Sequence, residues 1–391
     1  MANKNLTNAK RVKNDEFYTQ FVDIQKEIEA YLEYNPDVFR GKVVYCNCDD
    51  PYESNFFKYF VLKFNNIGLK KLITTSYVPS PITGTIFPLS GIEGLRRFTR
   101  KQPFKIEINE VKDLNNDGAV NLEDIECLLR QDQNVTTLLK GNGDFRSNES
   151  IEFLKQSDIV VTNPPFSLFR EYIKQLVDYD KKFLIIGNLN AITYKEIFPL
   201  IKENKVWLGN NYKVNAGAMF FEIPEKIANL DQVREIKTNE RGKKVYITRV
   251  QGVRWFTNLD HGRRHQPLPL MTEAEIIKFV TKKPFEKYDN YNALEVSLVK
   301  NIPSDYNGLM GVPISFLDKH SPEQFGIVGM CENEDLYKLK TKVYKSTECK
   351  QAYLDKFKKR GVYDLNASGV VIRAGLHEKV YQRVLIRHKK K

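Results

Sequence analysis

The sequence predicts an α/β protein with a parallel sheet that carries helices on both faces. Three observations lead to this fold class. Apolar strand patterns alternate with helical patterns as far as about residue 205. The strands read as continuous apolar runs, which is typical of strands buried on both faces. Hydrophobic residues make up 41% of the 391 positions, so the chain can bury a sizeable core.

Turn and capping residues set the limits of the first elements. The strand after Gly41 is a short apolar run, and Ser54 is a helix N-cap before an aromatic-rich segment that stops near Gly68. A second apolar run follows, then an irregular stretch, a strand of alternating polarity and two helical patterns. In order, these elements are a strand at 42–46, a helix at 55–64, strands at 69–75 and 104–111, and helices at 122–130 and 148–156.

The next elements complete the expected sheet. Apolar strands and helical patterns continue to alternate, and the apolar runs 218–221 and 253–256 are interpreted as a closing antiparallel pair. Beyond about residue 260 prolines and tyrosines become more frequent and helical periodicity fades, so we place a domain boundary there. In order, the elements are a strand at 158–162, a helix at 167–179, a strand at 182–187, a helix at 194–203 and an apolar run at 206–208.

Composition argues against several classes of protein. No stretch approaches the ~18 consecutive apolar residues of a membrane span, and the polar N-terminus lacks the apolar core of a signal peptide. The five cysteines are scattered and odd in number, which favours a reducing cytosol over a disulfide framework. We therefore expect a cytoplasmic protein with no membrane partner.

The net charge of +12 is concentrated near the C-terminus. Residues 351–391 hold eleven Lys and Arg against three acidic residues, an excess of eight positive charges with tyrosines interleaved. Arg263, Arg264 and His265 add cationic groups just after the expected boundary. Such clustering predicts a polyanionic partner that is held through phosphate contacts. On charge alone, a solvated basic tail explains the pattern equally well.

The most specific motif is the tetrad Asn163-Pro164-Pro165-Phe166, which directly follows an apolar strand. In open α/β sheets ligands bind beyond the carboxyl ends of the strands, so this position favours a site. The Asn163 side-chain oxygen and the Pro164 carbonyl can each accept one N–H of an exocyclic aromatic amine. Those bonds offset the positive charge that develops while the amine attacks a methyl donor.

The remaining members of the tetrad suit the same chemistry. Pro164 and Pro165 fix the backbone, so the acceptors are pre-organised, and Phe166 offers a ring on which a flipped base stacks. The alternative is a rigid turn that simply ends the strand.

The tetrad lies in a series of segments that resembles the EcoRI-type DNA adenine-N6 methyltransferases. The resemblance is strong to about residue 210, patchier to 320 and faint beyond. The tetrad alone is shared with other amine methylators, so the combination of segments is what makes the resemblance specific. These segments are DEFYTQ at 15–20, VVYCNCDDP at 43–51, SNFFKYF at 54–60, GDFRS at 143–147, VTNPPFSLFR at 161–170, KKFLIIGN at 181–188, KYDNY at 287–291, DYNG at 305–308 and GVPI at 311–314.

The resemblance implies a Rossmann-like class I methyltransferase domain over residues 1–260, with an insertion at about 78–140. It implies an α+β target-recognition region over 261–391. The implied reaction is methyl transfer from S-adenosylmethionine to the N6 amine of a flipped adenine in duplex DNA. The resemblance also implies a monomer, which is either the modification partner of a restriction endonuclease or an orphan relative.

The resemblance further implies which residues bind the cofactor. Two departures from the wider superfamily stand out: the loop 46–51 contains no glycine, and the second strand ends without the acid that usually binds the ribose. Asp49 or Asp50 is the expected substitute for that acid, with an Asp-Pro turn as the alternative. The methionine end is assigned to Phe17, Tyr18 and Thr19, and the loop after the first strand contributes Cys46, Asn47, Asp49, Asp50 and Pro51.

Asp144 is our choice for the amine of the cofactor's adenine, with Phe145 as its stacking neighbour. The alternative for Asp144 is an acid that stabilises the N-terminus of the following helix.

Residues 113–124 have the layout of a calcium loop, with Gly118 at the turn. The loop resembles the dockerin variant of the EF-hand, which has Asp rather than Glu at its last position. A single such loop is expected to bind calcium weakly, as a structural clip, and the alternative is an acidic surface turn. The expected ligands are Asp113, Asn115, Asp117, Asn121 and Asp124.

Three functions remain open on the sequence alone. The first is a site-specific DNA adenine-N6 methyltransferase, and the second is a methyltransferase that acts on RNA adenine or on protein glutamine. The third is a non-catalytic nucleic-acid-binding protein. The basic, tyrosine-rich C-terminal region favours DNA over a protein substrate, and the intact tetrad favours catalysis. The recognition sequence is not encoded by any motif here.

Overall fold

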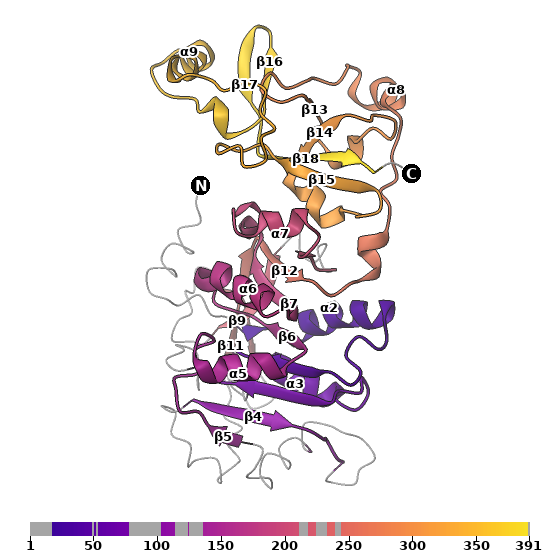
Figure 1. Ribbon diagram of the computed structural model, residues 1–391, viewed down its shortest axis with the longest axis vertical. Helices are drawn as coiled ribbons and strands as arrows, with labels where there is room; N and C mark the ends of the chain where they lie inside the picture. The colour runs from indigo at the N-terminus through magenta and orange to yellow at the C-terminus, as the bar shows by residue number, and fades with distance from the viewer. Residues whose placement is uncertain are drawn as a thin grey trace. The chain divides into compact units, whose positions relative to one another are not determined.

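Two compact units make up the chain, one of residues 1–201 with 205–262 and one of residues 202–204 with 263–391 (Figure 1). The computed structural model describes residues 18–48, 51, 54–77, 103–113, 124, 136–210, 218–223, 233–238 and 244–389.

The first unit is organised around an eight-stranded sheet of order β5-β4-β3-β2-β6-β7-β12-β8. The four central strands β3, β2, β6 and β7 run parallel. The strand order reverses between β2 and β6, which is the switch point where α/β sheets bind ligands. The strands are β2 (Val43–Cys46), β3 (Lys71–Thr75), β4 (Phe104–Ile108), β5 (Thr136–Leu138), β6 (Ile159–Thr162), β7 (Lys182–Asn188), β8 (Trp207–Leu208) and β12 (Val253–Thr257).

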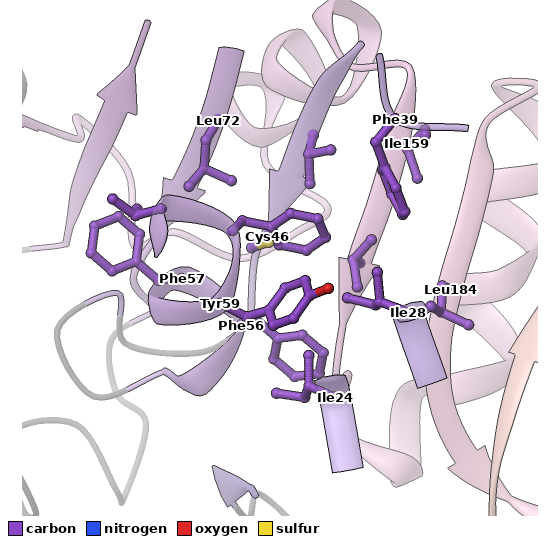
Figure 2. Close-up of a cluster of buried hydrophobic side chains, with 14 of the residues drawn as sticks. Ile24, Ile28, Phe39, Cys46, Phe56, Phe57, Tyr59, Leu72, Ile159 and Leu184 are labelled. Carbon is purple, nitrogen blue, oxygen red and sulfur yellow. The ribbon is translucent and has the colours of Figure 1, made fainter. Parts of the chain in front are cut away.

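Helices cover both faces of this sheet, as the fold class predicts. On one face, α2 (Phe21–Tyr34) and α3 (Asn55–Lys63) pack in a cluster with alternate residues of the strands (Figure 2). The other face carries α5 (Asn148–Gln156) and α6 (Phe169–Asp178), whose aromatic rings contact strand residues of the opposite parity. Because side chains alternate across a strand, both faces of the sheet are buried. A short helix, α7 (Phe198–Lys202), follows.

The outer strands depart from the expected parallel arrangement. β4 runs antiparallel to β3, β5 to β4, and β12 to both β7 and β8. A parallel neighbour needs a crossover back to the starting edge of the sheet, whereas β4 begins at the edge where β3 ends. The sheet is therefore mixed, with a parallel centre.

The interpretation of 218–221 and 253–256 as a pair is wrong. The first run lies in β9, within a separate four-stranded sheet of order β1-β9-β11-β10, whereas the second forms β12 of the main sheet. Gly252 lies between the two sheets with a φ of +72°, a left-handed conformation that glycine adopts readily, and there the chain changes sheet. The strands are β1 (Tyr18–Thr19), β9 (Ala218–Ile223), β10 (Val233–Thr238) and β11 (Lys244–Gln251).

The second unit is α+β, as predicted. Its four-stranded sheet has the order β13-β14-β18-β15, and a separate hairpin joins β16 to β17. No helix in the described part of the chain is both long and apolar enough to cross a membrane. The elements are α8 (Glu273–Ile276), β13 (Ala293–Glu295), β14 (Leu309–Pro313), β15 (Phe325–Met330), α9 (Ser346–Phe357), β16 (Val370–Arg373), β17 (Leu376–Lys379) and β18 (Arg383–His388).

The segment 287–291 helps to hold this second unit together. The Tyr288 hydroxyl donates to Glu295, which forms a buried ion pair with Arg383 at 2.7 Å. Asn290 is buried, and its side-chain oxygen accepts a hydrogen bond from the backbone N–H of Val370 at 2.8 Å. These residues join β13, β16 and β18, so this segment has a structural role.

Candidate active site

Three loops nominated from the sequence meet at the carboxyl edge of the parallel strands. The loop after β2 contacts the end of β6, because the Thr162 hydroxyl donates to the carbonyl of Asn47. The loop before α5 reaches the end of β3, because Gly143 lies so close that a Cβ there would be 2.0 Å from the Ser76 carbonyl oxygen. Gly143 also has a φ of +78°, so only glycine fits this contact comfortably.

The tetrad occupies the turn between β6 and the 3₁₀ helix η2 (Phe166–Leu168). Asn163 is 5% exposed and Pro164 is buried, whereas Pro165 is partly exposed. The carbonyl of Pro165 accepts a hydrogen bond from the Leu168 backbone at 2.9 Å. Within the described ranges no group donates to the Pro164 carbonyl. That oxygen can therefore accept a hydrogen bond from a ligand.

The helix behind the tetrad lies directly on the sheet. A Cβ at Gly187 of β7 would be 2.5 Å from the ring of Phe169, the first residue of α6. The same ring packs on Phe256 of β12 at 4.9 Å between centroids. Gly187 thus allows α6, and the turn before it, to approach the sheet closely. The segment 181–188 is part of the family resemblance, but no role for Gly187 is evident from the sequence.

Asn47, in the loop after β2 that is assigned to the cofactor, is bonded to residues on both sides of the tetrad. It is 4% exposed, and its side-chain oxygen accepts a hydrogen bond from the hydroxyl of Tyr172 on α6 at 2.5 Å. The ring of Tyr172 meets Phe145 edge to face at 4.9 Å. Burial raises the pKa of Tyr172 well above its ordinary value, so the hydroxyl remains a donor. Sequence reasoning missed Tyr172, because its contacts come from residues distant in the chain.

Asp144 is fixed by the guanidinium of Arg146. Arg146 Nε donates to Oδ1 at 2.8 Å and Nη2 to Oδ2 at 2.6 Å, and these bonds hold the pKa of Asp144 below its ordinary value. The N-cap of α5 is Ser147, whose hydroxyl accepts from the backbone of Ser150. Asp144 is therefore not the cap of that helix. Its ionised carboxylate keeps further lone pairs that can accept a ligand N–H.

The N-terminal segment reaches the same edge through a strand that the sequence did not predict. β1 pairs with β9, and the Asn55 side chain at the start of α3 donates to the Thr19 carbonyl at 2.7 Å. The Thr19 hydroxyl is buried and has no hydrogen-bond partner among the residues described. A buried hydroxyl beside a helix N-terminus fits the carboxylate of an amino-acid ligand. Phe17 and the side chain of Tyr18 lie outside the described residues.

The loop after β2 contains no glycine, and a cysteine occupies its left-handed position. Cys48 has a φ of +70°, a left-handed conformation that is uncommon for a residue with a side chain. Cys46 is buried in the core cluster and Pro51 is also buried. Asp49 and Asp50 lie outside the described residues, so their expected role at the ribose stays a prediction.

Only the two ends of the predicted calcium loop lie within the described residues. Asp113 and Asp124 are described, whereas Asn115, Asp117 and Asn121 are not. Among described residues, no group of three or more His, Cys, Asp or Glu side chains is arranged to hold a metal ion. Calcium binding at 113–124 therefore stays a prediction.

Several cations of the basic C-terminal region are engaged within the second unit. Lys356 pairs with Glu378 and Arg373 with Glu286, at 3.0 and 2.6 Å. The buried pair of Arg383 removes a third cation from the surface. Exposed cations remain on the turn that ends α9. They are Lys358, Lys359 and Arg360.

The three cationic residues after the boundary are also engaged. Arg263 donates to the Asp318 carbonyl, Arg264 to the Asn204 side chain at 3.1 Å, and His265 lies 2.9 Å from Glu323. Each of them thus has a structural contact in the second unit.

Comparison with known proteins identifies the family of this chain. The family described as "Adenine-specific methyltransferase EcoRI" matches residues 5–389. The chain is 47% identical to "Type II methyltransferase M.EcoRI" of Escherichia coli over 327 residues, which is 83% of this chain and 89% of that protein. It is 37% identical to "Type II methyltransferase M.MpnI" of Mycoplasma pneumoniae over 338 residues, covering 86% and 89%.

A third relative and the solved structures complete the comparison. "Type II methyltransferase M.MgeORF184P" of Mycoplasma genitalium is 36% identical over 325 residues, covering 83% of this chain and 86% of that protein. No solved structure gives a significant match. The family match over almost the whole length, together with the tetrad at the switch point of the sheet, shows that the chain belongs to the EcoRI family of adenine-specific methyltransferases.

Proposed function

We propose that the protein transfers a methyl group from S-adenosylmethionine to the N6 amine of an adenine flipped out of duplex DNA. The observation that supports it most strongly is that the tetrad lies at the switch point with Asn163 buried and with no described group donating to the Pro164 carbonyl. Family membership and the names of the relatives, each a Type II methyltransferase, support the same reaction.

The tetrad stabilises charge and orients the amine. The Asn163 side-chain oxygen and the Pro164 carbonyl each accept one N–H of the adenine amine, which directs the nitrogen lone pair away from the ring. S-adenosylmethionine, when bound, supplies the methyl group from its sulfonium. Both acceptors favour the amine as it gains positive charge, and they are fixed before the substrate arrives, so no reorganisation is needed. As the bond from nitrogen to the methyl carbon forms, the bond from that carbon to sulfur would break and leave a neutral thioether. The positively charged methylated amine would then release one proton to water, and Phe166 supports the flipped base.

The residues at the edge of the sheet fit the cofactor. The Thr19 hydroxyl and the N-terminus of α3 would hold the carboxylate of its methionine end. The ionised Asp144 would accept an N–H from the adenine end, with Phe145 beside it. Asn47 and the loop to Pro51 would line the centre of the site. The acid that binds the ribose is expected to be Asp49 or Asp50.

The second unit is the candidate DNA-recognition region. Its exposed cations on the turn after α9 can contact phosphates without breaking an internal ion pair. We further propose that the protein acts as a monomer in the cytoplasm. A pairing with a restriction endonuclease is proposed on the names of the relatives.

Substitution of Asn163 tests the proposed reaction. Asn163→Ala is expected to reduce transfer of labelled methyl from S-adenosylmethionine to duplex DNA by about 100-fold or more, because one of two charge-stabilising acceptors is lost. The rate is measured in single-turnover experiments with saturating cofactor.

Asn258 offers a matched control. This asparagine follows β12 and lies beside the start of β7, away from the carboxyl edge of the sheet. Its side chain accepts a hydrogen bond from the backbone of Phe183 at 2.8 Å and donates one to the carbonyl of Lys181 at 2.9 Å. Asn258→Ala should lower the melting temperature but leave the transfer rate within about threefold. Near-normal turnover in Asn163→Ala would contradict the assignment. Transfer to structured RNA or to a glutamine-containing peptide, in preference to duplex DNA, would redirect the substrate.

A further inference from the structure

We propose that Tyr172 is a positioning residue that couples the cofactor loop to the tetrad through Asn47. The inference rests on the proposed function, because it concerns the same cofactor and the same tetrad. The Tyr172 hydroxyl donates to Asn47, and its ring packs on Phe145. Tyr172 lies on α6, the helix that begins just after the tetrad, and it is 1% exposed.

Asn47 is bonded from both sides of the tetrad. Thr162, the residue before Asn163, donates its hydroxyl to the Asn47 carbonyl. Tyr172, which follows the tetrad, donates its hydroxyl to the Asn47 side-chain oxygen. A shift of Asn47 therefore acts on both ends of the turn that carries the two acceptors.

Helix α6 also contacts the loop before α5, which carries Asp144 and Phe145. The Tyr172 ring packs edge to face on Phe145, and Gln175, one turn later, donates to the Phe145 carbonyl at 3.1 Å. Two consecutive turns of α6 thus hold the loop that carries Asp144. The loop after β2 and the loop before α5 therefore both contact this one side chain, which lies on the helix that follows the tetrad.

This arrangement has a consequence for binding. A cofactor bound against the two loops would restrain Asn47 and Phe145, and through Tyr172 it would also restrain the tetrad. A displacement of about 1 Å at the reacting atoms costs on the order of 100-fold in rate, so this coupling matters. The effect is reciprocal, since the tetrad in its working position must favour the bound form of the loops equally.

The alternative is that Tyr172 only fills space between the helix and the sheet. In that case, removal of its hydroxyl lowers stability but does not change the cofactor affinity in a way that depends on Asn47. The two possibilities differ in a double-mutant cycle, because residues that act through one another show non-additive effects.

The test is a cycle of Asn47→Ala and Tyr172→Phe, with the dissociation constant of S-adenosylmethionine measured by calorimetry and stability by thermal melting. Tyr172→Phe keeps the ring but leaves the buried Asn47 oxygen without its donor. We expect it to weaken cofactor binding about 5- to 10-fold. In the Asn47→Ala background the same change is expected to have no further effect. Thr162→Val, which removes the other hydroxyl, should weaken binding in the same direction.

Tyr31 provides the matched control. It is a fully buried tyrosine on α2, and its hydroxyl donates to Glu27 at 3.0 Å, four residues earlier on the same helix. Tyr31→Phe makes the same chemical change and should lower the melting temperature. It should leave the dissociation constant within about twofold in both backgrounds.

The outcomes separate this inference from the proposed function. Additive effects of Tyr172→Phe and Asn47→Ala, or an unchanged dissociation constant in Tyr172→Phe, would overturn the positioning role even if the enzyme methylates DNA. A protein that binds the cofactor but leaves DNA unmethylated would contradict the proposed function, and the cycle would still decide the coupling. If the native chain does not bind S-adenosylmethionine, both proposals fall.

Discussion

Pro164 and Pro165 are adjacent in the chain, but their carbonyl oxygens have different surroundings. The Pro165 oxygen accepts a hydrogen bond from the backbone N–H of Leu168, and this bond begins the helical turn after the tetrad. The Pro164 oxygen has no donor in the described part of the protein. The Pro165 oxygen therefore stabilises the turn itself, whereas the Pro164 oxygen is available to a substrate amine.

A residue of the site could be predicted from the sequence only where its role depends on features that are local in the chain. The tetrad was recognisable because its residue types and its place after an apolar strand are local features. Tyr172 was not, because its partners Asn47 and Phe145 lie 125 and 27 positions away and only the fold brings them together. The left-handed Cys48 was also unpredictable, since nothing nearby in the sequence marks a residue with a side chain for that conformation.

Asp144 provides a prediction about pH at the scale of one residue. Its pKa lies below the usual value of about 3.9, because Arg146 donates to the ionised carboxylate. A carboxyl group whose pKa is lowered by folding adds stability above its unfolded pKa and loses it as the pH falls through the folded pKa. The stability lost in Asp144→Asn should thus be constant from neutral pH to about pH 5 and shrink below about pH 4.

Urea unfolding of both proteins across this range measures that difference. A stability difference that stays the same down to about pH 3 would show that the ion pair does not lower the pKa of Asp144.

At the scale of elements, α6 depends on the absence of a side chain at Gly187. Gly187→Ala places a Cβ against the ring of Phe169, so the start of α6 must move away from β7. The expected cost is about 1–3 kcal/mol in unfolding free energy. A loss of 10- to 100-fold in transfer rate is expected too, as an order of magnitude, because the tetrad precedes that helix. Denaturant unfolding and single-turnover rates measure the two effects.

Gly326 of β15 serves as the control for Gly187. A Cβ there would meet nothing within 4 Å, so Gly326→Ala should leave the rate unchanged. The double variant Gly187→Ala with Phe169→Leu should regain part of the lost rate, because the smaller side chain relieves the overlap. If Gly187→Ala is as active as the native protein, close packing of α6 is not required.

The elements themselves were predicted unevenly. Helix α3 was found from its Ser54 cap, which accepts from the backbone of Phe56 as expected. Helix α2 was missed because Gln20 at its start makes no side-chain cap. The spacing of Ile24, Ile28 and Tyr31 places them on one buried face and is the signal that would have revealed it. Strand β1 has only two residues, and it depends on β9, two hundred positions later.

At the scale of the whole molecule, the charge excess is less available than the sequence suggests. Arg373 and Arg383 pair with Glu286 and Glu295, which are 87 and 88 positions away. Counting charges in the last 41 residues cannot show such partners. The exposed turn after α9 is therefore a better candidate for phosphate contact than the region as a whole.

Neutralising that turn tests its part in DNA binding. The triple change of Lys358, Lys359 and Arg360 to Gln is expected to reduce the slope of log affinity against log salt by about 2–3, since each phosphate contact contributes about 0.9. The loss should be similar on specific and random duplexes. Fluorescence anisotropy at a series of salt concentrations measures it.

The matched control changes three exposed lysines at the edge of the main sheet where its parallel strands begin. Lys42, Lys70 and Lys182 lie at the starts of β2, β3 and β7, away from the carboxyl edge. Their replacement by Gln makes the same change in net charge and should leave the slope unaltered. Equal effects of the two triple variants would mean that net charge, and not the turn, governs binding.

Adenine methylation can be measured by mass spectrometry of the nucleosides from duplex DNA that has been incubated with the purified protein and methyl-labelled S-adenosylmethionine. The structure and the family predict label in N6-methyladenine, and its loss in Asn163→Ala under the same conditions. Label in a cytosine product, or no label in DNA while the protein binds the cofactor, would contradict the account.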